Sequence, residues 1–430
     1  MSLGPTTRIR WLLVSWLFVL SAVGFLDRAN LGIAATRIEA DYHLSDVQFG
    51  SLSTFFLLGY ALFQTPAGWL ADKWGARRVL AGGVIWWGIF TALTASVPTT
   101  WRYPLTALIF TRLLLGIGEA VTYPASNQFS ARWIPTQERG LANGVIFAGV
   151  GIGSAVAPSL ITYIMLQRGW RFSFWVCAII GFVAGLAWFL IARDKPEQHR
   201  RVSAEELATI RAGLTLDDAS AGAKPATVPW DLILRSRDLW AITLSYFSYG
   251  YVAWIFFAWF FTYLARVRGL NLKSSAFYAT LPFLAMAVTS PLGGLIGDWL
   301  TRTKGRRLGR CGVAVFGIAL TGIFLAFGST ASSPRVASVI LAGGAGALYL
   351  SQSSFWAVSA DIGGAFAGSV SGFMNMGAQF GGAVTASLTP AIAARYGWTA
   401  SFLVAAALSF LGSFLWLAVK PDRGLIKSEQ

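Results

Sequence analysis

The sequence is poor in the residues on which most enzyme and metal sites depend. Only two cysteines and two histidines occur among 430 residues. Cys177 and Cys311 lie in or beside apolar stretches and lack the spacing of metal ligands, so neither a disulfide framework nor a zinc site is predicted. His43 and His199 fall in expected loops, and no serine lies near a plausible base. We therefore expect no enzymatic activity and no cofactor or metal.

Charged residues are also scarce. They make up 12% of the chain, against roughly 25% in soluble proteins, whereas 55% of the residues are hydrophobic. This composition indicates an integral membrane protein. The net charge of +15 does not indicate a nucleic-acid partner. The basic residues cluster between hydrophobic stretches, as the cytoplasmic loops of membrane proteins do.

Twelve stretches are long and apolar enough to cross a membrane, which takes about 20 residues as a helix. They run roughly over 11–34, 46–70, 79–97, 103–124, 140–164, 171–192, 239–264, 275–298, 310–329, 336–360, 366–394 and 398–419. An even number of crossings puts both chain ends on one side. Lysine and arginine are concentrated in the segments on that side, so both termini are predicted to be cytoplasmic.

One long polar stretch divides the twelve candidates into six plus six. We predict an N-terminal six-helix bundle over 1–193, a cytoplasmic central loop over 194–237 and a C-terminal six-helix bundle over 238–430. Within the loop, Ser203 and Glu206 have the spacing of a capping box that opens a short helix ending near Leu214. Residues 217–229 have the composition of a flexible linker.

The two halves repeat each other's sequence features. Gly68-Trp-Leu-Ala-Asp-Lys-Trp-Gly-Ala-Arg-Arg78 follows the second apolar stretch, and a similar sequence from Gly294 to Arg307 follows the eighth. The later copy places Asp298 where the earlier one has Asp72. This repetition indicates duplication of a six-helix unit.

Four charged residues interrupt the apolar stretches: Asp27 and Arg28 in the first, and Arg112 and Glu119 in the fourth. A charge at the bilayer centre costs about 2.5–3.5 kcal/mol on insertion scales. Arg112 and Glu119 are nearly two helical turns apart, so both leave the same face, separated by about 10 Å along the axis. A purely structural network is the alternative, but buried charge pairs often add no stability. We interpret the four charges as a functional site.

Several motifs resemble one transporter family. The pattern Gly-x-x-x-Asp-x-x-Gly-x-Arg-Arg resembles the signature of the major facilitator superfamily. More narrowly, the chain resembles its anion:cation symporter family, which includes proton-coupled carriers of galactonate, glucarate and hexuronates. The motifs that carry this second resemblance are Asp27-Arg28-Ala-Asn30, Tyr60-x-x-x-Gln64-x-Pro66, Arg112-x-x-x-Gly-x-x-Glu119 and Trp259-Phe-Phe-Thr-Tyr-Leu264.

The resemblance implies an all-α membrane protein with twelve transmembrane helices in two six-helix bundles. The implied function is secondary active transport: proton-coupled uptake of an organic anion across the bacterial inner membrane by alternating access. The anion would be a sugar acid, whether a hexuronate, an aldonate or an aldarate. Residues 145–154 supply no amide where the sugar-acid carriers often have a glutamine, so the exact acid stays open.

Roles for individual residues also follow from the resemblance. Arg28 would bind the substrate carboxylate, Asp27 and Glu119 would carry the protons, and Arg112 would be their charge partner. Further positions that match the sugar-acid site are Tyr60, Gln64, Ser353, Trp356 and Asn375. Asn375 and Gln379 share a helical face and could bond either a sugar hydroxyl or a neighbouring helix.

A second group of charges is expected to gate transport. Asp72, Arg77 and Arg78 lie at the membrane edge, and Asp298 occupies the repeated position. We expect this group to hold the two halves together on the cytoplasmic side instead of contacting substrate. The alternative is ordinary positive charge on a cytoplasmic loop.

Other functions remain open from the sequence alone. They are facilitated or sodium-coupled transport of an organic anion, export, and a non-transporting membrane sensor. The expected partners are a small organic anion, protons and membrane lipid, with the chain acting as a monomer.

Overall fold

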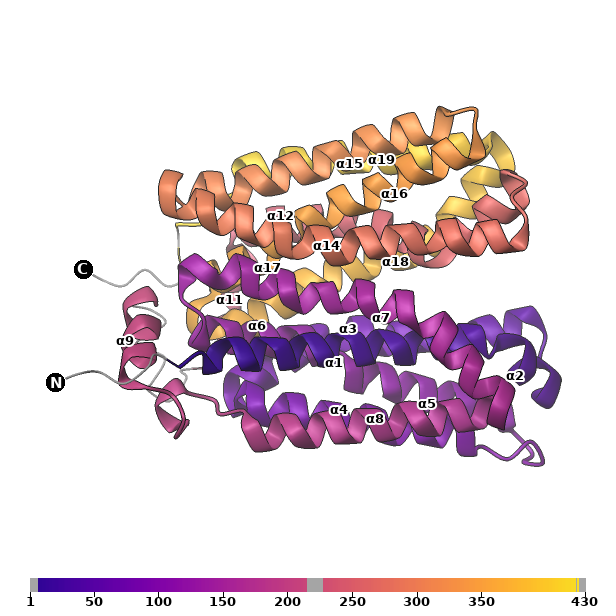
Figure 1. Cartoon of the computed structure of the whole chain (residues 1–430), viewed down its shortest axis with the longest axis horizontal. Helices are drawn as coiled ribbons and strands as arrows, with labels where there is room; N and C mark the ends of the chain where they lie inside the picture. The colour runs from indigo at the N-terminus through magenta and orange to yellow at the C-terminus, as the bar shows by residue number, and fades with distance from the viewer. Residues whose placement is uncertain (1–6, 215–226, 423, 425–430) are drawn as a thin grey trace.

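The chain is described by a computed structural model over residues 7–214, 227–422 and 424, and these residues form helices and no β-strand. The first half contains α1 (Ile9–Ile33), α2 (Ala35–Tyr42), α3 (Asp46–Trp74), α4 (Ala76–Ser96), α5 (Pro104–Glu119), α6 (Thr122–Trp133), a 3-10 turn η1 (Thr136–Glu138), α7 (Arg139–Arg168) and α8 (Trp170–Ile191). Figure 1 shows these helices side by side as the lower bundle.

The second half forms the upper bundle in Figure 1. It contains α11 (Trp230–Arg235), α12 (Arg237–Trp254), α13 (Phe260–Thr262), α14 (Leu272–Lys304), α15 (Val313–Thr330), α16 (Pro334–Leu350), α17 (Gln352–Gly363), α18 (Ala367–Tyr396) and α19 (Trp398–Leu415). Short π-helical and 3-10 segments complete it: η3 (Ile255–Trp259), η4 (Tyr263–Val267), η5 (Arg307–Gly312), η6 (Gly364–Phe366) and η7 (Trp416–Ala418). Between the halves lie η2 (Pro196–Gln198) and α9 (Ala204–Gly213).

The helices supply the predicted twelve crossings. Ten segments of the described chain are long and apolar enough to span a membrane, and one of them, Pro334–Tyr396, has 63 residues. Inside it the chain reverses at Gly364, whose φ of 49° suits glycine, so α16–α17 and α18 are separate crossings. α3 is the remaining crossing: it has 29 residues and packs among the others, although it is less apolar. The predicted all-α class with twelve membrane helices is confirmed.

Two of the crossings are interrupted at matching positions of the two halves. The fourth crossing breaks between α5, which ends at Glu119, and α6. Pro124 has no N–H to bond the carbonyl of Ala120, so a continuous helix would lack that hydrogen bond. The tenth crossing breaks at Ser351, between α16 and α17. Helices interrupted at corresponding positions of two repeats commonly mark the binding site of a transporter.

Glycines let the two bundles touch backbone to backbone. The halves meet where α7 packs on α14 and where α3 packs on α18. A Cβ on Gly68 would collide with the carbonyl of Gly368, and one on Gly294 would collide with the carbonyl of Gly140. Gly68 and Gly294 lie near the ends of α3 and α14, and their partners lie at the starts of α18 and α7. Figure 1 shows α9 at the end of the molecule where α1 begins. We call this end the terminal face.

The central loop corrects one detail of the capping prediction. Ser203 Oγ accepts the N–H of Glu206 at 3.2 Å, as predicted. The Glu206 carboxylate, however, does not return to Ser203: it accepts the N–H groups of Ile9 and Arg10, each at 3.0 Å, and the Thr7 hydroxyl at 2.6 Å. The free N–H groups at the start of α1 attract the carboxylate more strongly. α9 is thereby anchored to the start of the chain, while the part of the predicted linker at 217–226 lies outside the described residues.

Candidate functional site

A cavity of about 770 Å³ lies between the two bundles. It reaches from Tyr60, in the middle of α3, past Arg28 to Ile33 at the end of α1 and Ser53 near the start of α3. Those helix ends are far from the terminal face, because α1 begins there and α3 runs back towards it. The cavity therefore opens on the side of the molecule opposite the terminal face.

The terminal face is closed by a first contact between the halves, which we call the first latch. The Asp72 carboxylate, on α3, accepts the N–H of Gly368 at 2.9 Å and both the N–H and the hydroxyl of Ser369, at 2.7 and 2.6 Å. These groups form the start of α18. The N–H groups and positive dipole of a helix start favour a carboxylate, so Asp72 binds the opposite half.

The second latch repeats the first with the halves exchanged. The Asp298 carboxylate, on α14, accepts the N–H groups of Gly140 and Leu141 at the start of α7, at 2.9 and 2.7 Å. It also pairs with Arg310 at 2.7 Å. The duplicated sequence thus places an aspartate of each half on a helix start of the other half.

Three further charged residues close this face and were not identified from the sequence. Arg139 pairs with Asp361 across the halves at 2.7 Å, and both side chains are fully buried. Arg310 donates to the carbonyl of Thr136 at 2.6 Å, again across the halves. Each residue stands at the end of a membrane segment, where it resembles any positive or capping residue, so only the tertiary structure identifies its partner.

Arg77 and Arg78, predicted to belong to the gate, make no hydrogen bond or ion pair with the second half among the described residues. The Arg77 N–H donates to Asp194, at the start of the central loop, at 2.9 Å, and its guanidinium donates to the carbonyl of Phe189 in the first half at 2.8 Å. Arg78 is exposed at the rim of an apolar groove lined by α3, α4 and α5. The structure therefore places the inter-half contacts of this motif on Asp72.

Arg28 is the charged group at the centre of the cavity. Its Nε donates to Glu119 Oε2 at 2.6 Å. Its guanidinium carbon lies 4.2 Å from the ring centre of Tyr60 and 4.7 Å from that of Phe25, distances at which cation–π attraction operates. Only 15% of the Arg28 side chain is exposed, and 1% of that of Glu119. The aromatic rings and the carboxylate hold the guanidinium in place at the cavity wall.

Asp27 and Arg112 are the other two charged residues beside this pair. Asp27 Oδ2 accepts the Thr91 hydroxyl at 2.5 Å, and Oδ1 has no hydrogen-bond partner. Arg112 stacks on Phe56 at 4.9 Å, and its Nε and Nη1 have no partner. Neither residue forms an ion pair within the described chain. Both are only 2% exposed, so their charges act on the Arg28–Glu119 pair through a medium of low dielectric constant, where electrostatic effects are strong.

Of the five other predicted substrate residues, two line the cavity and three do not. Tyr60 and Asn375 line the cavity. Gln64 lies one layer deeper, where its Oε1 accepts Asn375 Nδ2 at 2.7 Å. Ser353 and Trp356 are buried on α17 and are absent from the cavity wall, although Trp356 Nε1 donates to the hydroxyl of the cavity residue Tyr246 at 2.9 Å.

Most of the polar wall in the second half was not found from the sequence. The residues that were not found are Tyr246, Tyr249, Tyr349 and Gln352. Gln379, which the sequence analysis considers together with Asn375, also lines this wall. The tyrosines are aromatic residues in apolar helices, and nothing in their composition distinguishes them from interfacial or lipid-facing rings. The one available signal was their three-residue spacing at 246 and 249, which puts both on one face of α12.

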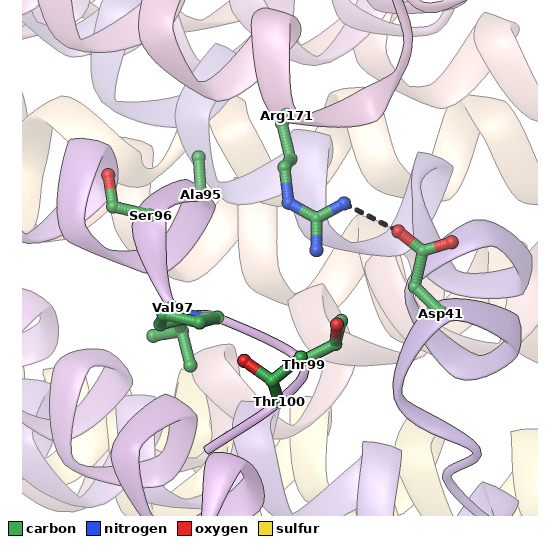
Figure 2. A pocket seen from close by; sticks show the side chains of 8 residues that line it. Asp41, Ala95, Ser96, Val97, Thr99, Thr100 and Arg171 are labelled. Atoms are coloured by element: carbon green, nitrogen blue, oxygen red, sulfur yellow. Dashed lines mark hydrogen bonds and ion pairs between the residues drawn. The ribbon is translucent and has the colours of Figure 1, made fainter.

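A second, smaller hollow of about 570 Å³ lies at the end of the molecule away from the terminal face. Figure 2 shows Arg171 and Asp41 pointing toward one another across it, above the loop at 97–100 that follows α4. Arg171 Nη1 lies 2.6 Å from Asp41 Oδ2, and both side chains are well exposed, at 38% and 40%. This ion pair joins α8 to α2 within one half, so it does not gate the cavity.

The ion pair between Asp41 and Arg171 should make a small, pH-dependent contribution to the stability of the protein. The indole N–H of Trp170, followed by Arg171, lowers the pKa of the Asp41 carboxyl. Its contribution to stability is therefore complete above the unfolded pKa of about 3.9 and is lost as the pH falls through the lower folded value. We expect Asp41→Asn to lower the Tm by no more than a few degrees at pH 7, and the difference from wild type to shrink below about pH 4. Thermal unfolding of both proteins between pH 3 and 8 measures it; a difference that grows on acidification would contradict the assignment.

Comparisons with known proteins agree with this architecture. A protein of Cupriavidus necator described as a probable sulfoacetate transporter is 30% identical over 416 residues, which cover 96% of this chain and 94% of that protein. The hexuronate transporter of Bacillus subtilis is 27% identical over 405 residues, covering 93% of this chain and 92% of that one.

A solved structure shows the same fold. The proton:xylose symporter bound to 6-bromo-6-deoxy-D-glucose superposes with a TM-score of 0.72 at 16% sequence identity, covering 96% of this chain and 95% of that one. Residues 17–386 match the sequence profile described as the Major Facilitator Superfamily. The resemblance seen in the sequence motifs is thereby confirmed, and this multi-pass membrane protein belongs to the Major Facilitator Superfamily.

Proposed function

We propose that the protein takes up an organic anion, specifically a sugar acid, together with one or more protons across the bacterial inner membrane. The names of the sulfoacetate and hexuronate transporters support an anionic substrate. The concentration of basic residues on the segments of the terminal face supports a cytoplasmic position for both chain ends. The cavity then faces the outside, ready to receive substrate.

The observation that carries the proposal is the Arg28–Glu119 pair at the cavity wall, 2.6 Å apart. A largely buried guanidinium at a cavity wall is a binding site for a carboxylate, but Glu119 already occupies one of its nitrogens. Protonation of Glu119 removes this competitor and leaves Arg28 for the substrate. The substrate carboxylate in turn favours the protonated form of Glu119, because two carboxylates near one arginine repel each other. Proton and anion thus favour each other's binding, which is the coupling that symport requires.

Movement between the two open states follows from the latches. In the outward-open form the halves are held together at the terminal face by Asp72 and Asp298. Opening to the cytoplasm has to break both contacts while the halves close around the cavity. A substrate that neutralises the central charges lowers the electrostatic cost of that closure.

Uptake into proteoliposomes tests the proposal against its alternatives. With an inwardly directed proton gradient, acidic outside, we expect accumulation of a hexuronate, aldonate or aldarate against its own gradient. We expect no accumulation with a sodium gradient alone. Accumulation driven only by sodium would replace proton coupling with sodium coupling. Equilibration without accumulation would indicate a facilitator, and absence of any saturable flux would indicate a sensor. A thermal-shift screen of these acids selects the substrate to use.

The first latch yields a prediction that separates binding from movement. Asp72→Asn removes the charge that three donors of α18 share, while the cavity stays intact. Hydrogen bonds to charged groups contribute about 1.5–3 kcal/mol, so we expect the outward-open state to lose population and transport to slow by about tenfold. Substrate affinity should stay within about threefold of wild type. Binding and flux measured on the same preparation decide it.

The control for this variant is Asp41→Asn, which removes an aspartate ion pair that stays within one half. It should leave flux at the wild-type rate. Loss of substrate binding in a well-folded Asp72→Asn protein would show that Asp72 acts on the site and not on the gate.

A further inference from the structure

The two walls of the cavity differ in charge. The charged side chains that line it, Arg28 and Arg112, both come from the first half, and the described residues of the second half contribute no charged group to the wall. In place of charge, the second half presents tyrosine hydroxyls and the amides of Gln352, Asn375 and Gln379. A ligand that bridges the cavity therefore meets a cationic wall at one end and a neutral polar wall at the other.

Arg28 is the cation that a ligand can reach. The Arg112 residue is 2% exposed and its guanidinium lies against Phe56. Arg28, with 15% of its side chain exposed, projects further into the cavity. Asp27 and Glu119 balance the two arginines, so the first wall offers one exchangeable position for an anionic group: the position on Arg28 that Glu119 now fills.

The amides of the opposite wall form a chain with an unpaired end. Gln379 Nε2 donates to Asn375 Oδ1 at 3.4 Å, and Asn375 Nδ2 donates to Gln64 Oε1 at 2.7 Å. Gln379 Oε1 has no partner. On the same wall Gln352 Oε1 is also without a partner in the described chain. A buried polar group without a partner is unfavourable, so a ligand that supplies the missing hydrogen bonds gains affinity.

These unpaired groups favour hydroxyls over carboxylates. An amide oxygen accepts a hydrogen bond, and a sugar hydroxyl can donate one, whereas an ionised carboxylate has no proton to donate. A carboxylate placed there would lie against amide oxygens in a desolvated site, with no cation to compensate it.

We propose that the substrate carries a single anionic group, bound by Arg28, and neutral hydroxyls at its opposite end. This charge class comprises hexuronates and aldonates and excludes aldarates, which carry a carboxylate at each end. The inference rests on the proposed function, transport of a sugar acid. It distinguishes sugar acids by whether the end that faces the second half is charged.

A matched pair of ligands tests the inference. Glucuronate and glucarate share a six-carbon polyhydroxylated skeleton and differ in whether the second end is charged. We expect purified protein at pH 7 to bind glucuronate, or the aldonate gluconate, at least tenfold more tightly than glucarate in isothermal titration. Glucarate binding that equals or exceeds both would overturn the inference while supporting transport of a sugar acid. Binding of none of the three would overturn the proposed sugar-acid function and this inference with it.

A substitution in the wall formed by the second half gives a second test. It compares the ratio of two affinities, so it does not depend on how tightly the protein binds either ligand. Gln379 is half-buried and lines the cavity, so Gln379→Lys places a cation opposite Arg28. We expect it to shift the glucarate-to-glucuronate affinity ratio by at least tenfold in favour of glucarate. Gln379→Met, of similar length without the amide, is the control and should weaken both ligands without that shift. Equal changes in affinity for both ligands in the lysine variant would show that this wall does not discriminate between ligands by charge.

Discussion

Replacing Arg28 with lysine is expected to weaken substrate binding by ten- to a hundredfold while the protein stays folded. A guanidinium can bond a carboxylate with two parallel N–H groups, whereas an ammonium acts as a point charge. Each hydrogen bond between charged groups contributes about 1.5–3 kcal/mol, and the loss of one such bond gives the stated range. The planar group is also matched to its surroundings, with Tyr60 and Phe25 at 4.2 and 4.7 Å from its centre.

Isothermal titration of the substrate into wild type and Arg28→Lys measures the effect. Arg171→Lys is the matched control, because Arg171 also pairs with a carboxylate at 2.6 Å but lies in the outer hollow, away from the cavity. It should bind substrate as wild type does. If Arg28→Lys keeps the wild-type affinity, another group holds the anion and the proposed role of Arg28 is wrong.

The charged centre could be located from the sequence because charge inside a membrane is unfavourable. Asp27, Arg28, Arg112 and Glu119 interrupt apolar stretches, and insertion scales assign each such residue a cost of about 2.5–3.5 kcal/mol. Their pairing could not be predicted. Glu119 is the last residue of α5, where the helix breaks, and it meets Arg28 of α1 instead of following the two-turn spacing to Arg112.

The neutral part of the site shows the opposite situation. Tyr246 and Gln352 are unremarkable in sequence, yet in the fold the Tyr246 hydroxyl accepts Gln352 Nε2 and Trp356 Nε1, each at 2.9 Å. The family resemblance places Trp356 in the substrate site, but in the structure it is absent from the cavity wall and donates to the hydroxyl of Tyr246, which lines the cavity. Which side of a polar helix faces a cavity depends on packing between helices that are distant in sequence, and a single sequence does not contain that information.

The gate was located from the repeat, and its partners came from the fold. The repeated aspartates, Asp72 and Asp298, stand at equivalent positions in the two halves. Each binds backbone N–H groups of the other half, at the starts of α18 and α7. Backbone donors carry no sequence signature, so the sequence predicts that Asp72 helps to hold the halves together but does not identify its partners.

The second large effect is expected at Glu119, whose neutralisation should separate transport from its driving force. Glu119→Gln retains the side-chain shape and removes the charge that holds Arg28 at 2.6 Å, so the variant resembles a permanently protonated carrier. The carrier should bind substrate at least as tightly as wild type and exchange it across the membrane. Without a proton to take up and release, it should no longer concentrate substrate in response to a pH difference. We expect accumulation to fall at least tenfold, with counterflow preserved.

Substitution of Asp27 tests whether a coupling proton can sit on a carboxylate that does not compete with the substrate for Arg28. Its carboxylate accepts a hydrogen bond from Thr91 and forms no hydrogen bond or ion pair with Arg28, so a substrate cannot displace it as it displaces Glu119. Asp27→Asn should also lose pH-driven accumulation if Asp27 carries a coupling proton. If the proton on Asp27 is needed for the empty carrier to reorient, net uptake should fall while exchange continues.

Counterflow and pH-driven uptake, measured side by side in proteoliposomes, decide between these outcomes. Asp41→Asn controls for reconstitution, because it neutralises an aspartate outside the cavity. Loss of accumulation in Glu119→Gln with normal counterflow would assign the coupling proton to the carboxylate that competes with substrate for Arg28. If both Glu119→Gln and Asp27→Asn still accumulate substrate with wild-type pH dependence, neither carboxylate carries the coupling proton. The symport mechanism would then be wrong even though the fold and the family are shown.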